Sequence, residues 1–229
     1  MKPLRYFFDH PIAAGKGTPR YFERLFAGLL HLVLPLLFRP RIEGTHQLRA
    51  HPDLSAGFIL AGNHRSYLDP LFVMLALRPR PVRFISKEEF FKLPVIRRLA
   101  AWIGAYPVKR GSADMQVIKR SVAMLQRGEL VGIFPEGSRG RAGETRQIHS
   151  GLGLIAYLSK APVVPFRLWN TEAISPPGTR LWRFPTVKLA FGQPLSINDA
   201  RYQHLNKSER LERFSHDVME ATYQLSEPH

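Results

Sequence analysis

The chain alternates short apolar runs with segments whose apolar residues recur at helical spacing, and this alternation limits the folds open to it. Buried strands are expected at the apolar runs 58–62, 82–86, 130–134, 163–168 and 186–191. Helices are expected at 70–77, 88–102, 113–127, 151–159 and, from apolar residues spaced along one face, 211–225. Strands that alternate with helices indicate an α/β fold in which helices flank a mixed, largely parallel sheet. Binding sites in such sheets gather in the loops beyond the carboxyl ends of strands.

The first 40 residues read as a separate helical part that ends where Arg39-Pro40 breaks the pattern. The run 25–38 is almost wholly apolar and has basic residues on both sides. A helix that spans a membrane needs about 20 apolar residues, so this run suits a helix lying in the membrane surface. The alternative is a helix buried in the core. We therefore expect a membrane-associating helical segment at 1–40 and an α/β domain at 41–229.

The loop expected after the strand at 58–62 reads N-H-R-S-Y-L-D-P and contains His64 and Asp69. Pro70 pre-sets the first turn of the next helix, which makes Asp69 a natural N-cap. A histidine on a loop folded over that helix start can meet the aspartate. An aspartate bonded to one imidazole nitrogen lets the other nitrogen act as a general base, with a substrate hydroxyl or water as the nucleophile. The alternative is that Asp69 only caps the helix while His64 packs.

The loop expected after the strand at 130–134 is rich in groups that bind anions. It reads F-P-E-G-S-R-G-R-A-G-E over 134–144. Glycines let backbone amides approach an anion, and arginine offers a planar fork for phosphate. The loop lacks the G-K-[ST] ending of a nucleotide-binding P-loop. A flexible solvent loop is the alternative interpretation.

Together with two further blocks, these loops make the chain resemble the glycerolipid acyltransferases typified by lysophosphatidic acid acyltransferase. That family carries N-H-x-x-x-x-D, G-x-x-x-x-x-R, F-P-E-G-[ST]-R and V-x-P in this order. The chain has these blocks at Asn63 to Asp69, Gly104 to Arg110, Phe134 to Arg139 and Val163 to Pro165. The order and the separations match, and the resemblance extends over about residues 20 to 195.

The resemblance implies an O-acyltransferase in which His64 takes the proton of a lipid hydroxyl as it attacks an acyl thioester, with Asp69 orienting the imidazole. The residues implied to hold the acyl acceptor are Arg110, Glu136, Gly137, Ser138 and Arg139. The acceptor would be a lysophospholipid, by default 1-acylglycerol 3-phosphate, and the product phosphatidic acid. The donor would be acyl-CoA or acyl carrier protein, a co-substrate, so that no cofactor and no metal is required. The resemblance also implies an N-terminal helical membrane-binding motif, and we expect a peripheral or monotopic enzyme on the cytoplasmic face of the cell membrane.

The charge of the chain agrees with acidic substrates and an anionic membrane surface. There are 33 Lys and Arg residues against 18 Asp and Glu, a formal net charge of +15, which favours polyanionic partners. The basic residues are dispersed and no nucleic-acid-binding motif is present, so no specific nucleic-acid partner is expected. The absence of cysteine excludes disulfides, thiolate metal sites and a cysteine nucleophile.

One position departs from the family pattern, and other functions stay open. Many relatives have Phe-Lys-x-Gly after the third block, whereas this chain has Ile148-His149-Ser150-Gly151, and His149 is a weaker and switchable cation. Alternative acceptors are glycerol 3-phosphate and lyso-aminolipids. A thioesterase or lipid hydrolase would use the same base on water, although no G-x-S-x-G motif is present. A non-catalytic lipid-binding module is the remaining alternative.

Overall fold

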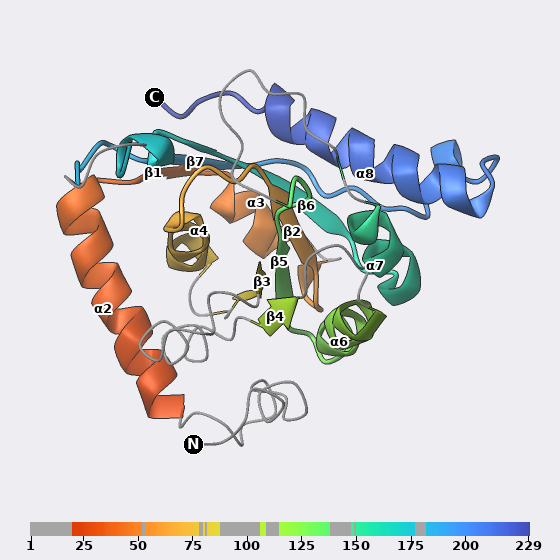
Figure 1. The fold of residues 1–229 in the computed structure, drawn as a ribbon, viewed down its shortest axis with the longest axis horizontal. Coiled ribbons are helices and arrows are strands. Elements are labelled where there is room, and N and C mark those ends of the chain that lie inside the picture. Colours follow the sequence, from red (N-terminus) through yellow and green to blue (C-terminus); the bar gives the residue numbers. More distant parts are fainter. Residues whose placement is uncertain are drawn as a thin grey trace.

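The computed structural model describes residues 20–51, 54–77, 80, 82–87, 106–108, 115–137, 148, 150–176 and 182–229. The helices are α2 (Arg20–Phe38), α3 (Thr45–Ala50), α4 (Asp69–Leu77), α6 (Met115–Gln126), α7 (Gly151–Ser159) and α8 (Lys207–Gln224). The strands are β1 (Arg41–Glu43), β2 (Ile59–Gly62), β3 (Val82–Lys87), β4 (Tyr106–Val108), β5 (Leu130–Ile133), β6 (Val163–Trp169) and β7 (Lys188–Phe191). Within the described residues, seven strands form one sheet in the order β1-β7-β6-β2-β5-β3-β4 (Figure 1).

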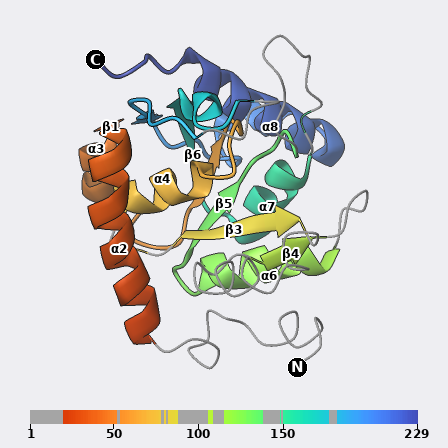
Figure 2. The ribbon, with the colours of Figure 1, turned by 60° about the vertical axis from the view of Figure 1, so that its left-hand side comes forward.

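The sheet is largely parallel, as the sequence predicts. Neighbouring strands run parallel throughout this order except for β6 and β7, which pair antiparallel. The central strands β2 and β5 are buried at every residue. Both strands are continuous apolar runs because a parallel sheet is covered on both faces. Helices provide that cover, with α2 and α4 on one side and α6, α7 and α8 on the other (Figure 1, Figure 2).

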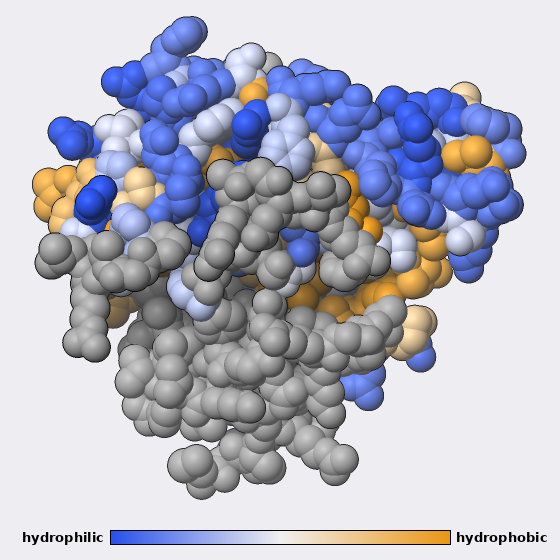
Figure 3. Space-filling model, turned by 45° about the horizontal axis from the view of Figure 1, so that its top comes forward, coloured by the Kyte–Doolittle hydropathy of each residue, from blue (hydrophilic) through white to orange (hydrophobic). Residues whose placement is uncertain are grey.

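Two apolar clusters, one on each face, hold these layers together. Side chains of a strand point alternately to opposite faces, and accordingly Leu60 of β2 belongs to the cluster under α2 and α4. Its neighbours Ile59 and Ala61 belong to the cluster under α6, α7 and α8. Phe214 and Val218 of α8 are fully buried in the second cluster. Hydrophilic residues cover most of the outer surface of α8 (Figure 3), so this helix is amphipathic, as its apolar spacing predicts.

Helix α2 has one side in the core and another in solvent. Leu30, Leu34 and Phe38 are buried in the cluster that also contains α4, whereas four leucines on the opposite side are 54 to 77% exposed: Leu25, Leu29, Leu32 and Leu36. One side of α2 is therefore part of the core, and the membrane-surface role of the run 25–38 stays a prediction. Within the described part of the chain, none of the helices has the length and apolar character needed to traverse a bilayer.

Most of the expected elements are confirmed, with shifts of a few residues at their ends. The strands expected at 58–62, 82–86, 130–134, 163–168 and 186–191 are β2, β3, β5, β6 and β7. Gly128 directly follows the helix expected at 113–127 and lies at the end of α6, with φ +80°, and its N–H donates to the carbonyl of Leu125. The sequence did not predict β1 or α3, because segments of three and six residues are too short to show a period. The helix expected at 88–102 lies outside the described residues.

Helices α7 and α8 cross so closely that a glycine is required at the contact. The N–H of Gly153 donates to Ser215 Oγ over 3.0 Å, which satisfies one of the amides left unpaired at the start of α7. A Cβ at Gly153 would collide with the backbone carbonyl of Leu211. The absence of a side chain at Gly153 is therefore what lets α8 pack this closely against α7.

We expect Gly153→Ala to lower the free energy of unfolding by about 1 to 3 kcal/mol, because the added methyl group overpacks a backbone contact. Gly151→Ala is the matched control on the same helix, since a Cβ there meets nothing within 4 Å, and it should leave stability unchanged or slightly raised. Urea unfolding of both variants beside the wild type measures the difference. Equal stability of the two variants would contradict the close crossing.

Candidate active site

Two of the loops singled out in the sequence emerge side by side from the sheet. Strands β2 and β5 are parallel neighbours, with Ala61 opposite Ile133. Their carboxyl ends therefore lie at the same edge, and the N-H-x-x-x-x-D loop and the F-P-E-G loop both begin there. This is the position at which open α/β sheets bind their ligands.

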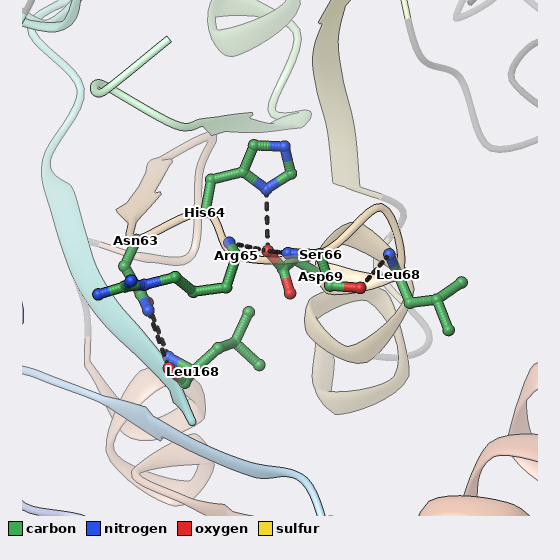
Figure 4. Close-up of polar contacts among 7 residues, drawn as sticks. All are labelled: Asn63, His64, Arg65, Ser66, Leu68, Asp69 and Leu168. Carbon is green, nitrogen blue, oxygen red and sulfur yellow. Dashed lines mark hydrogen bonds and ion pairs between the residues drawn. The ribbon is translucent and has the colours of Figure 1, made fainter. Parts of the chain in front are cut away.

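The first loop brings His64 and Asp69 into contact. His64 Nδ1 lies 2.9 Å from Asp69 Oδ2 (Figure 4). The same carboxylate oxygen accepts hydrogen bonds from the backbone N–H groups of Arg65, at 2.7 Å, and Ser66, at 2.8 Å. Asp69 is fully buried, whereas 19% of the His64 side chain is exposed. The buried carboxylate of Asp69 thus joins the end of the loop to its beginning and holds the partly exposed imidazole in place.

The capping role expected of Asp69 needs a correction. The sequence predicts an N-cap, whose side chain would accept hydrogen bonds from the first turn of the helix. Helix α4 instead begins at Asp69 itself, and its carboxylate bonds to amides that precede the helix. The carboxylate turns back toward the loop because Arg65, Ser66 and His64 offer three donors there.

The contact with Asp69 assigns different roles to the two imidazole nitrogens. A carboxylate accepts a hydrogen bond, so Nδ1 carries the proton and Nε2 carries the lone pair. Nε2 lies on the side of the ring away from Asp69 (Figure 4). The arrangement is therefore suited to removing a proton from a group that approaches Nε2, with Asp69 stabilising the imidazolium that forms.

An aromatic ring from the second loop supports the imidazole. Phe134, the residue after β5, stacks on His64 with ring centroids 4.1 Å apart and an interplanar angle of 17°. Phe134 stacks in turn against Phe84 of β3 at 5.4 Å. Stacking fixes the plane of the imidazole, while the hydrogen bond to Asp69 fixes its direction. Two loops far apart in the sequence therefore orient one side chain.

Asn63 ties the first loop to the neighbouring strand. Its Nδ2 donates to the carbonyl of Leu168, and its Oδ1 accepts from the N–H of Leu168, both at 2.8 Å. The paired register of β2 and β6 ends at Gly62 and Phe166. The amide side chain of Asn63 thus bonds to β6 as another strand residue would, and holds the chain immediately before His64.

The other residues predicted for the site are only partly described. Glu136 and Gly137 lie on the loop after β5, where Glu136 is 6% exposed and Gly137 has φ +63°. Arg110, Ser138 and Arg139 lie outside the described residues, as does His149.

The sequence interpretation did not assign roles to Asn63 and Phe134, although both belong to the quoted blocks. The signal in the sequence was their place in these blocks, since Asn63 directly precedes His64 and Phe134 lies two residues before Glu136. Their partners, Leu168 and His64, are brought to them by the sheet.

We expect Asn63→Ala to lower the free energy of unfolding by about 1 to 3 kcal/mol, because it leaves the buried N–H and C=O of Leu168 unpaired. Urea unfolding checks this value. Asn198→Ala is the control, since Asn198 is exposed and substitutions at such positions change stability by about 0.5 kcal/mol or less. Equal effects at the two positions would argue against the bridge to β6.

Comparison with known proteins identifies relatives of the chain. A family model described as Acyltransferase matches residues 39–169, more than half of the chain. The 1-acyl-sn-glycerol-3-phosphate acyltransferase of Bacillus subtilis (strain 168) is 30% identical over 185 residues, which are 81% of this chain and 87% of that protein. The lyso-ornithine lipid O-acyltransferase of Pseudomonas aeruginosa is 35% identical over 105 residues, 45% of this chain and 39% of that protein.

A solved structure supports the same fold. The crystal structure of the 1-acyl-sn-glycerophosphate acyltransferase from Thermotoga maritima superposes with a TM-score of 0.65 and 20% sequence identity, covering 88% of this chain and 78% of that one. The family match and the relative from Bacillus subtilis establish the class of protein. The chain belongs to the glycerolipid acyltransferase family of the lysophosphatidic acid acyltransferase type, and it is an O-acyltransferase.

Proposed function

We propose that the enzyme transfers a fatty acyl group from acyl-CoA or acyl carrier protein to the free hydroxyl of 1-acylglycerol 3-phosphate, giving phosphatidic acid. The observation that carries the proposal is the contact of 2.9 Å between His64 Nδ1 and Asp69 Oδ2, which prepares Nε2 as a base. The relative from Bacillus subtilis is named for an acyl transfer to this acceptor. The formal charge of +15 suits an acidic donor and an acidic acceptor.

In the proposed reaction, His64 Nε2 takes the proton of the acceptor hydroxyl while the hydroxyl oxygen attacks the carbonyl carbon of the thioester. Asp69 stabilises the imidazolium through its hydrogen bond to Nδ1. The tetrahedral intermediate then breaks its C–S bond and expels the thiolate, which receives the proton from the imidazolium. The acyl group ends as an ester and His64 returns to its neutral state. No metal or cofactor enters this sequence.

The acceptor would be held by the second and third sequence blocks. Arginine binds phosphate through two parallel hydrogen bonds, and for this reason we assign the acceptor phosphate to Arg110 and Arg139. Glu136, Gly137 and Ser138 would complete the acceptor site. The loop that carries Glu136 begins with Phe134, whose ring stacks on His64, so binding of the acceptor there would bring its hydroxyl toward the base.

A second acceptor has specific support. The relative from Pseudomonas aeruginosa is named for acyl transfer to a lyso-ornithine lipid and is 35% identical over its matched region. A lyso-aminolipid is therefore the first alternative to 1-acylglycerol 3-phosphate, followed by glycerol 3-phosphate. Free fatty acid as the only product would instead indicate a thioesterase.

We further propose that α2 lies on the membrane surface from which the acceptor is drawn. The exposed residues Leu25, Leu29, Leu32 and Leu36 are spaced by four, three and four positions, which places them in one stripe along the helix. An apolar stripe of this kind can enter the boundary between headgroups and acyl chains. The enzyme would act as a peripheral or monotopic protein on the cytoplasmic face of the cell membrane.

Two exposed aromatic residues support a membrane contact beside α2. Trp182 is 59% exposed and Phe184 is 46% exposed. The ring of Phe184 lies 5.5 Å from that of Phe38, the last residue of α2. Aromatic side chains favour the headgroup level of membranes, so the segment that contains them would extend the surface formed by α2.

We expect His64→Ala to lower acyl transfer by about 10²- to 10⁴-fold, because it removes the general base. The measurement is transfer of a radiolabelled acyl group from acyl-CoA to 1-acylglycerol 3-phosphate, with wild type, His64→Ala and His46→Ala assayed together. His46 is an exposed histidine of α3, and its removal should leave the rate unchanged. Retained transfer in His64→Ala would refute the assignment of the base.

We expect Leu32→Gln/Leu36→Gln to weaken binding to vesicles of phosphatidylcholine and phosphatidylglycerol by tenfold or more, because burial of each leucine contributes about 1.5 to 3 kcal/mol. Cosedimentation with the vesicles measures the affinity. The control is Leu158→Gln, since Leu158 is a leucine of α7 that is 42% exposed. If Leu32→Gln/Leu36→Gln bound the vesicles as tightly as the wild type, the leucine stripe would be ruled out as the membrane contact.

A further inference from the structure

The last turn of α8 reaches the loop that carries Glu136. The hydroxyl of Tyr223 donates a hydrogen bond to Glu136 Oε1. Glu136 follows β5, whereas Tyr223 comes near the end of the chain, beyond the residues 39–169 that match the family model. Glu136 is 6% exposed, and burial of a carboxylate is costly unless hydrogen bonds compensate for the water it loses.

Tyr223 is itself held by β6. The guanidinium of Arg167 lies over the Tyr223 ring, 5.4 Å from its centroid, and over the Trp169 ring at 4.9 Å. Nη1 of the same guanidinium donates to the backbone carbonyls of Tyr223 and Leu225. These carbonyls are at the end of α8, where the partial charge of the helix is negative and a cation is favourable. Arg167 therefore fastens the end of the helix and the Tyr223 ring to the sheet.

The residue before Tyr223 contacts the other strand that leads into the site. Thr222 is fully buried, and its hydroxyl lies 3.5 Å from the carbonyl of Ala61 in β2. Its stronger hydrogen bond, at 3.0 Å, goes to Val218 within the helix. Two consecutive residues of α8 thus contact β2, which precedes His64, and the loop after β5. The end of α8 is positioned relative to both parts of the site.

We propose that Tyr223 is a positioning residue that acts through Glu136, setting residues 134–137 of the loop after β5 in the conformation that binds the acyl acceptor. This inference rests on the proposed function in one respect, the assignment of that loop to the acceptor. The Tyr223 hydroxyl directs one oxygen of the carboxylate toward α8, and the orientation of the second oxygen follows from the first. A hydrogen bond to a charged group is among the stronger ones in proteins.

The first test is the steady-state kinetics of Tyr223→Phe, which removes the hydroxyl and keeps the ring beneath Arg167. We expect KM for 1-acylglycerol 3-phosphate to rise about tenfold, while kcat and KM for acyl-CoA change less than twofold. The matched control is Tyr202→Phe, which removes a hydroxyl hydrogen-bonded to Asp217 over 2.8 Å in the cluster under α6, α7 and α8. The control should leave all three constants unchanged. An unchanged KM for the acceptor in Tyr223→Phe would overturn the proposal.

The second test needs no substrate. Backbone hydrogen exchange of residues 131–137 should be about tenfold faster in Tyr223→Phe than in the wild type, and unchanged in Tyr202→Phe. In a Glu136→Ala background, Tyr223→Phe should add nothing further, because the two residues act as one unit. Equal exchange in wild type and Tyr223→Phe, or additive effects of the two substitutions, would overturn the proposal. If the wild type transfers no acyl group to any acceptor, the proposed function fails, and hydrogen exchange still decides whether Tyr223 holds the loop.

Discussion

The carboxylate of Asp69 is the group on which the candidate site depends. It is fully buried, and one of its oxygens accepts hydrogen bonds from two backbone amides and one imidazole nitrogen. A buried charge is tolerated only when such donors surround it. The donors are His64, Arg65 and Ser66, which precede Asp69 in the same loop. The hydrogen bonds that stabilise the carboxylate therefore also hold the loop in its fold. The orientation of His64 is thus tied to the stability of the loop.

The sheet adds restraints on His64 that Asp69 does not provide. Because β2 pairs in parallel with both β5 and β6, the chain before His64 has a neighbour on either side. Asn63 bonds to β6 on one side, and Phe134 comes from beyond β5 on the other to stack on the imidazole. The imidazole of His64 is therefore held by the hydrogen bond to Asp69, by the ring of Phe134 against its face and by the bonds of the preceding residue, Asn63. Restraint of this kind is what the proposed role of His64 requires, since a general base acts only near its productive geometry.

Among the described helices, the first, α2, and the last, α8, cover different surfaces of one fold. Helix α2 buries one face against α4 and leaves a stripe of leucines exposed. Helix α8 buries its apolar face against the sheet and ends beside the loop after β5. A carboxylate in one sequence block is thereby connected to a tyrosine near the C-terminus. The residues matched by the family model therefore do not include every residue that contacts the loop after β5.

The sequence by itself determined the type and order of most elements, because helical periodicity, apolar runs and residues such as Gly128 act locally. It also determined which side chains enter the two loops, and the spacing of His64 and Asp69 limited how they could meet. Only the tertiary structure decided the strand order, the stacking of Phe134 on His64 and the hydrogen bond from Tyr223 to Glu136. These contacts join residues distant in the chain, and local patterns carry no information about distant partners. These contacts form only when the sheet has assembled and brought distant segments together.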